Sequence, residues 1–255
     1  DSQARPGDLP PGAASTLITV LVDDGKLDEA ARRLEELGPA LDAGERADLH
    51  RALVRGYVKA GDLDRAGAVL GTDSTVEGLA LHGWLRLYRG DVAGALAAFQ
   101  LAGPFAGDRA EATRRTALLA LLQPIEADTV PELGRAMLAL EQGDTSRATS
   151  ALEHIGGALP PAKGGAEASL LAARLAAAAG DTSAAERLYH VAAAPEAPAT
   201  APAAELALGE LLLARRRTAD AVAQLEHLIL TYPQSVLVPQ ARRLLDQAKG
   251  AVPRT

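Results

Sequence analysis

Cysteine and asparagine are both missing from this chain of 255 residues, and aromatic residues make up only 3% of it. Without cysteine there is no disulfide bond, no thiolate ligand for a metal and no cysteine nucleophile. Without asparagine there is no acceptor for N-linked sugars. No stretch approaches the ~18 uninterrupted apolar residues of a membrane-spanning helix, since Arg174 interrupts the apolar run 170–179. These absences exclude several classes of site before any motif is considered.

Positive charge is also scarce in this chain. The formal net charge is -7, and the longest basic run is only residues 215–217. A protein that binds a phosphate backbone clusters its positive charge, so nucleic acid is not expected as a partner. There is no Gly-rich phosphate loop and no serine-elbow motif. The sequence therefore predicts a protein that is not an enzyme and that binds no cofactor.

The five histidines do not form a metal-binding pattern. They are His50, His82, His154, His190 and His227. Each falls in a different segment of the helical array argued below, where equivalent positions lie about 10 Å apart, whereas zinc needs ligands about 2 Å from the metal. The last three recur at nearly one position, beside acidic residues such as Glu153 and Glu226. We expect them to lie on a solvated surface, with no metal bound.

A six-residue phrase, Gly-Asp-x-x-x-Ala or a close variant, recurs along the chain. Its copies begin at Gly25, Gly61, Gly90, Gly143 and Gly180, with a glycine-less copy at Arg216. The successive spacings are 36, 29, 53, 37 and 36 residues. Glycine can adopt the left-handed conformation that ends a helix, and the aspartate after it can cap the next helix. The phrase therefore predicts a tight turn between two helices.

Two further positions of each copy are expected in the core. The alanine of the phrase is small enough to let two helices approach to about 8–10 Å, and a larger residue follows it four positions later, on the same helix face. The pairs are Ala30 and Leu34, Ala66 and Leu70, Ala95 and Phe99, Ala148 and Leu152, Ala185 and Tyr189, and Ala221 and Leu225. Twelve residues before the alanine, Gly83 and Gly209 take a small position of the preceding helix, with alanine as the substitute in other copies.

Together these residues resemble the tetratricopeptide repeat family, whose helix-turn-helix unit has about 34 residues. The resemblance covers most of residues 17–250 and implies an all-α, right-handed α-solenoid of about six helix pairs with a broad binding surface. The expected pairs span residues 17–37, 48–70, 75–101, 130–155, 166–192 and 203–230. The long step between Gly90 and Gly143 predicts one extra helix near 108–122. A polar helix over 238–249 is expected to cap the C-terminal end.

The chain is expected to divide at its Pro-rich segments. Residues 1–13 form a Pro/Gly-rich lead, and residues 14–192 the main solenoid. Residues 193–202 read as an extended connector, followed by the last pair and its cap in 203–255. The lead begins at Asp1 without an apolar segment, which is consistent with the mature end left by signal-peptide cleavage and equally with a chain trimmed at that point.

Residues 232–235, Tyr-Pro-x-Ser, precede an Ala-containing helix. This phrase resembles the repeats of bacterial envelope proteins, notably outer-membrane assembly lipoproteins and the periplasmic partner of the Tol-Pal system. The resemblance implies export to the periplasm or cell envelope, as a non-enzymatic scaffold within a larger assembly. The phrase also has a structural use, because proline ends one helix and serine caps the next. A cytoplasmic regulatory or chaperone-like peptide binder, and a structural subunit that self-assembles through its solenoid ends, are the alternatives.

The tetratricopeptide resemblance also predicts a binding groove. In that family the first helix of each pair lines the concave surface, and the positions that face it correspond to Arg51, Arg55 and Lys59 in the second pair, and to Trp84 and Tyr88 in the third. The three cations are spaced i, i+4 and i+8, on one helix face. Arginine, tryptophan and tyrosine are frequent binding hot spots. We expect this groove to bind an acidic, partly apolar peptide segment. The alternative is a solvated face for the cations and a packing role for the aromatic residues.

Overall fold

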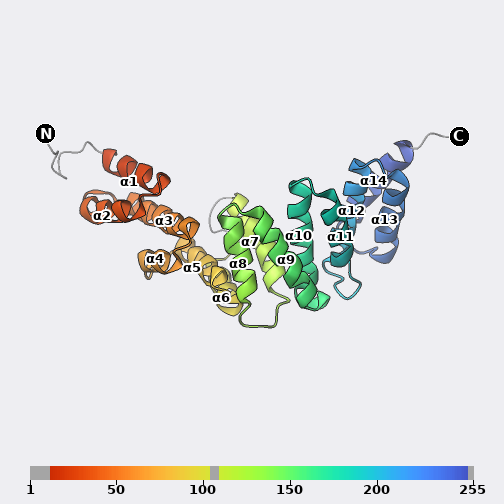
Figure 1. The fold of residues 1–255 in the computed structure, drawn as a ribbon, viewed down its shortest axis with the longest axis horizontal. Helices are drawn as coiled ribbons and strands as arrows, with labels where there is room; N and C mark the ends of the chain where they lie inside the picture. Colours follow the sequence, from red (N-terminus) through yellow and green to blue (C-terminus); the bar gives the residue numbers. More distant parts are fainter. Residues whose placement is uncertain (1–11, 104–108, 252–255) are drawn as a thin grey trace. The chain divides into compact units, whose positions relative to one another are not determined.

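The structure is a computed structural model that describes residues 12–103 and 109–251 (Figure 1). Within these residues every named element is a helix, and one isolated β-bridge joins Asp91 and Thr129. The α-helices are α1 (Ala13–Asp23), α2 (Leu27–Leu37), α3 (Ala43–Ala60), α4 (Leu63–Leu70), α5 (Val76–Tyr88), α6 (Val92–Ala102), α7 (Arg109–Leu122), α8 (Pro131–Glu141), α9 (Thr145–Ala158), α10 (Gly165–Ala178), α11 (Thr182–Ala192), α12 (Ala201–Ala214), α13 (Thr218–Thr231) and α14 (Val238–Ala251). Two 3-10 turns, η1 (Gly38–Ala40) and η2 (Pro161–Lys163), complete the list. The all-α prediction is confirmed for the described chain.

Some of the predicted segments lie partly outside the described residues. Most of the lead expected over 1–13 lies outside the described residues, and α1 already begins at Ala13. The extra helix expected near 108–122 corresponds to α7, of which Asp108 lies outside the described residues. No helix in the described ranges is both long and apolar enough to cross a lipid bilayer.

The helices form two compact units. The first contains the described residues up to 117 together with 127–144, and the second contains 118–126 and the described residues from 145 onward. The chain passes between the units at three points, which lie inside α7, in the segment between α7 and α8, and at the turn between α8 and α9. The residues on both sides of the 193–202 segment, where the sequence predicted a connector, belong to the second unit.

The recurring turns have the predicted local chemistry. Their glycines adopt positive φ angles, which are 73° at Gly25, 83° at Gly61, 82° at Gly90, 81° at Gly143 and 82° at Gly180. The side chains of Asp62, Asp91 and Asp181 accept hydrogen bonds from the backbone N–H three residues later, at 3.0, 2.8 and 2.9 Å. In the glycine-less copy Arg216 adopts a φ of 58°, and it is the one residue other than glycine in the described chain with a positive φ.

The repeated alanines are core residues, as the sequence predicted. All six have an exposed fraction of 0%, and the large residue four positions after each is also buried. The small residue of the preceding helix faces that large residue. A Cβ atom on Gly83 would lie 2.6 Å from the Phe99 ring, and one on Gly209 would lie 2.7 Å from the Leu225 side chain. Glycine at these two positions is therefore required by the close approach of the paired helices.

In the first unit, helices α1 to α6 pack mainly against their neighbours in the chain, and α8 packs against both α5 and α3. The segment before α8 is held by the turn between α5 and α6, where the Val130 N–H donates to the Gly90 carbonyl at 2.8 Å. Gly134 allows α8 to approach closely. A Cβ atom there would lie 2.5 Å from Gly90 N and 2.7 Å from Tyr88 O. This contact brings the end of α8 to the site described below.

In the second unit, α10 packs against α9 and α11, while α12 packs against α11 and α13. Helix α14 packs on α13, and its Leu244 and Leu245 contact the buried cluster of that pair. The sequence predicted an extended connector between α11 and α12, but this segment is not extended in the structure. It folds as successive turns, with Ala197 N–H donating to the Ala194 carbonyl at 3.0 Å and Thr200 N–H to the Ala197 carbonyl at 2.9 Å. Small alanine side chains permit these turns, and Ala197 is buried.

Candidate functional site

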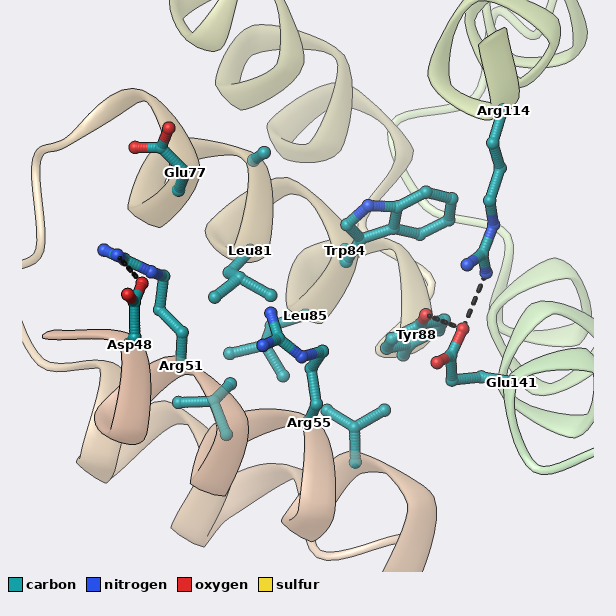
Figure 2. Close-up of a pocket in the computed structure, with 13 residues that line it drawn as sticks. Asp48, Arg51, Arg55, Glu77, Leu81, Trp84, Leu85, Tyr88, Arg114 and Glu141 are labelled. Carbon is teal, nitrogen blue, oxygen red and sulfur yellow. Dashed lines mark hydrogen bonds and ion pairs between the residues drawn. The ribbon is translucent and has the colours of Figure 1, made fainter. Parts of the chain in front are cut away.

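A hollow of about 510 Å³ lies in the first unit between α3 and α5 (Figure 2). On α3 the helical period brings Arg51, Arg55 and the valines between and after them to one face. On α5 the same period aligns Glu77, Leu81, Trp84 and the residues one turn further on. Helices α7 and α8 add one charged side chain each. The floor is apolar and is formed by Val54, Val58, Ala80, Leu81 and Leu85.

Four of the five residues that the sequence singled out line this hollow, namely Arg51, Arg55, Trp84 and Tyr88. Lys59 does not line it. The side chain of Lys59 is exposed, and its backbone carbonyl accepts a hydrogen bond from Gln142 Nε2 at 3.3 Å. The structure therefore brings the two arginines and the two aromatic residues together and leaves the lysine outside.

Trp84 is mainly a packing residue. It is only 6% exposed, and its ring contacts Phe99 edge-on, with the ring centroids 5.3 Å apart. Its ring also stacks on Tyr88 at a centroid distance of 5.9 Å. The guanidinium carbon of Arg114, from α7, lies 4.3 Å from the Trp84 ring centroid, which is cation–π geometry. The alternative of a packing role thus describes Trp84, although part of the residue still lines the hollow.

Tyr88, Arg114 and Glu141 form a network at one end of the hollow (Figure 2). The Tyr88 hydroxyl donates to Glu141 Oε2 at 3.2 Å, and Arg114 Nη2 donates to the same oxygen at 2.6 Å. Burial, together with the neighbouring Glu141 carboxylate, raises the pKa of Tyr88 far above its usual value. The phenol therefore remains a hydrogen-bond donor, and it holds the carboxylate of α8 against α5.

The two arginines of α3 differ in their surroundings. Arg51 Nη2 lies 2.6 Å from Asp48 Oδ1, and Arg51 Nη1 lies 3.7 Å from Asp73 Oδ2. Its side chain is 15% exposed. Arg55 is exposed and points into the hollow, and within the described residues it makes no hydrogen bond or ion pair (Figure 2). The expected stripe of free positive charge is thus reduced at the hollow to Arg55, because acidic side chains neutralise Arg51.

Four charged lining residues of the hollow were not singled out from the sequence: Asp48, Glu77, Arg114 and Glu141. Glu77 lies in the first turn of α5, is exposed, and makes no hydrogen bond or ion pair with the described residues. A sequence signal for it exists, since Glu77 stands at the same distance from its repeat alanine as Asp48 does. Arg114 and Glu141 come from distant helices, and no repeat position indicates them. With both included, the hollow is lined by three arginines and three acidic residues.

The three histidines expected on a solvated surface, His154, His190 and His227, are all exposed. His227 has an additional role, because its Nδ1 atom lies 3.0 Å from both carboxylate oxygens of Glu205. Glu205 is buried, so this exposed histidine is also the partner of a core carboxylate. In the part of the chain that the structure describes, no group of three or more His, Asp or Glu side chains is arranged to hold a metal ion.

Comparison with known proteins adds no assignment to this geometry. No protein-family model matches the chain, and no curated protein matches it in sequence. The chemistry of the hollow therefore carries the functional argument. An apolar floor beside an arginine that has no ion-pair partner among the described residues can bind a group that is apolar on one side and negatively charged on the other.

Proposed function

We propose that this protein is a non-enzymatic scaffold of the tetratricopeptide kind. In this proposal the helices form a right-handed α-solenoid of about six pairs, with α7 as the extra helix and α14 as the cap. The proposal is supported by the left-handed turns, the aspartate caps and the buried alanines that recur in the predicted register. The scaffold binds a short segment of a partner protein in the hollow between α3 and α5.

The observation that carries the binding proposal is the unpaired Arg55 above an apolar floor. A carboxylate placed beside a guanidinium forms a charge-assisted hydrogen bond, about twice as strong as a neutral one. The floor under it, which includes Leu81 and Leu85, can bury an apolar side chain of the same segment. The volume of about 510 Å³ falls within the range of about 300–1,000 Å³ typical of ligand sites. The partner chemistry that fits is an acidic residue close to an apolar one.

Arg55→Glu tests this proposal, with Lys59→Glu as the matched control. Both substitutions reverse an exposed positive charge on α3, one turn apart, but only Arg55 lines the hollow. The probes are fluorescent peptides that carry one glutamate next to one leucine in neutral flanks. Arg55→Glu should weaken their binding about tenfold or more, which is about 1.4 kcal/mol. Lys59→Glu should leave the affinity within about twofold of wild type, and both variants should melt close to it, since exposed charges contribute little to stability. Equal affinities of the two variants would contradict the proposal.

An envelope location belongs to the same proposal and rests on the Tyr-Pro-x-Ser resemblance. In the structure this phrase forms the turn between α13 and α14, where the Ser235 N–H donates to the Tyr232 carbonyl at 2.9 Å. The Ser235 hydroxyl accepts a hydrogen bond from Leu237 N–H at 3.3 Å, which is the structural use of the phrase. Fractionation of cells that make the native protein tests the location. Recovery with the cytoplasm would favour the regulatory peptide binder, and concentration-dependent polymers in sedimentation experiments would favour the self-assembling subunit.

A further inference from the structure

The two ends of the hollow carry opposite surplus charge. At one end are Asp48 and Glu77, together with Arg51, which pairs with Asp48 and with Asp73, a residue outside the lining. This end is therefore negative, and Glu77 makes no hydrogen bond or ion pair within the described chain. Asp48 remains 76% exposed despite its pairing with Arg51, so it can still meet a ligand.

The rest of the hollow has a positive surplus. Arg114 and Glu141 neutralise each other through their contact at 2.6 Å, so Arg55 remains as the uncompensated charge there. Figure 2 shows Asp48 and Glu77 at one side of the hollow, the Tyr88 network at the other, and Arg55 pointing inward between them. A ligand with a single charge would satisfy only one of these regions.

The repeat register gives the distance between the two regions. Counted back from Ala66 on α4 and Ala95 on α6, Asp48 stands at the same repeat position as Glu77. Asp48 precedes Arg55 by seven residues on α3, which is about 10 Å along a helix that rises about 1.5 Å per residue. An extended peptide advances about 3.3 Å per residue. The separation therefore corresponds to about three residues of an extended ligand.

We propose that the hollow recognises an extended segment with a basic and an acidic residue three positions apart and an apolar residue between them. The basic residue lies at Glu77 and Asp48, the apolar one on the Leu81 floor, and the acidic one at Arg55. This inference rests on the proposed peptide-binding function and specifies the class of segment. It also accounts for the equal number of acidic and basic side chains around the hollow. A ligand with the same charge at both ends would be repelled by one of the two regions.

The first experiment compares peptides that differ in one charge. The probes are fluorescein-labelled peptides with neutral flanks around Lys-Ala-Leu-Glu, Gln-Ala-Leu-Glu and the reversed order Glu-Leu-Ala-Lys. Wild-type protein should bind one of the two bipolar peptides about tenfold more tightly than the glutamine peptide, a difference of about 1.4 kcal/mol. Glu77→Gln should remove this preference while leaving the affinity for the glutamine peptide unchanged.

The second experiment exchanges the charges of the site. In the double variant Glu77→Arg with Arg55→Glu, the preference between Lys-Ala-Leu-Glu and Glu-Leu-Ala-Lys should reverse, although the composition of protein and peptide is conserved. Circular dichroism melting of the same samples checks that the variants remain folded, and Glu77→Gln, a neutral substitution on an exposed residue, is the backup if the double variant unfolds.

The outcomes separate this inference from the proposed function. If all three peptides bind equally, and Arg55→Glu weakens them all while Glu77→Gln weakens none, the bipolar specificity is wrong and the acidic-peptide site stands. If no peptide binds the wild-type protein, or if Arg55→Glu changes nothing, both the specificity and the proposed site are wrong.

Discussion

The Nδ1 atom of His227 lies 3.0 Å from both carboxylate oxygens of Glu205, across the contact between α13 and α12. Glu205 is 2% exposed, whereas the His227 side chain is 58% exposed. A buried carboxylate is costly unless it is paired and hydrogen-bonded. The histidine therefore pairs with the Glu205 carboxylate and lowers the cost of burying an acid between α12 and α13.

Removal of this partner should destabilise the second unit. His227→Ala leaves the Glu205 carboxylate buried without its histidine, at a cost of about 1–3 kcal/mol in the free energy of unfolding. Urea unfolding followed by circular dichroism measures this loss. His190→Ala is the matched control, because His190 is exposed at nearly the same repeat position of α11, and it should change the free energy by less than about 0.5 kcal/mol. Equal stability of the two variants would show that the pair contributes nothing.

Arg216→Gly should stabilise the turn between α12 and α13. Arg216 holds a φ of 58°, which costs a residue with a Cβ atom about 1–2 kcal/mol. Glycine removes this strain but adds about 0.5–1 kcal/mol of backbone entropy in the unfolded chain. We expect a net gain of up to about 1 kcal/mol in urea unfolding.

The converse substitution is the control for that turn. Gly180 has a φ of 82°, and a Cβ atom there would meet no other atom within 4 Å. Gly180→Ala should therefore destabilise the protein through backbone strain alone, by about 1 kcal/mol. If Arg216→Gly is neutral while Gly180→Ala destabilises, the strain assigned to Arg216 is relieved elsewhere in the turn.

Gly134→Ala should lower the stability of the first unit and also distort the hollow. The added Cβ atom would meet backbone atoms of Leu87, Tyr88 and Gly90 at 2.5 to 2.8 Å, and backbone cannot rotate away as a side chain can. Overpacking of this kind costs about 1–3 kcal/mol. It should also displace Glu141 and so weaken peptide binding.

The control for this overpacking is Gly157→Ala in α9, where a Cβ atom would meet nothing within 4 Å. Its stability should rise by up to about 1 kcal/mol through helix propensity. Two variants with equal melting temperatures would mean that α8 does not approach α5 as closely as described.

The first unit should lose stability below neutral pH. Burial lowers the pKa of His50 and of His82, and an arginine one turn away on the same helix adds to the effect, while Asp73 opposes it in both cases. The folded histidines thus bind protons less readily than the unfolded chain, where the pKa is about 6.5. The contribution of the two neutral histidines to the free energy of unfolding should be fully present above about pH 6.5. It should be lost as the pH falls below that value. The double variant with both histidines changed to Gln should flatten this fall, as urea unfolding at a series of pH values would measure.

The sequence predicted the helices and turns well because their signals are local. A glycine, an aspartate and an alanine within six residues determine each turn, and their chemistry does not depend on distant parts of the chain. The turns between α11 and α12 were missed because composition excludes a helix there but does not distinguish extended chain from tight turns. The acid in the core of the last pair was missed for a different reason, since periodicity alone gave Glu205 no partner.

The candidate site was predictable only in part. Repeat position placed Arg51, Arg55 and the two aromatic residues on facing helices, but the same spacing continued to Lys59, which lies beyond the hollow. The charge balance depended on contacts that repeat spacing does not encode. Asp73 stands in a loop, and Arg114 and Glu141 come from helices that the repeat pattern does not place beside α3 and α5.

The return of α8 to α3 and α5 changes how the first unit can fold. In a regular array each repeat contacts only its neighbours, and folding can begin at any repeat and propagate. Here Gln142 Nε2 donates to the Lys59 carbonyl, 83 residues earlier in the chain. Contacts with such long sequence separation require the closure of a large loop, which slows folding and couples distant helices. The segment from α3 to α8 is therefore the smallest module that could be exchanged here, and a helix pair cannot be inserted or deleted within that segment without breaking the closure.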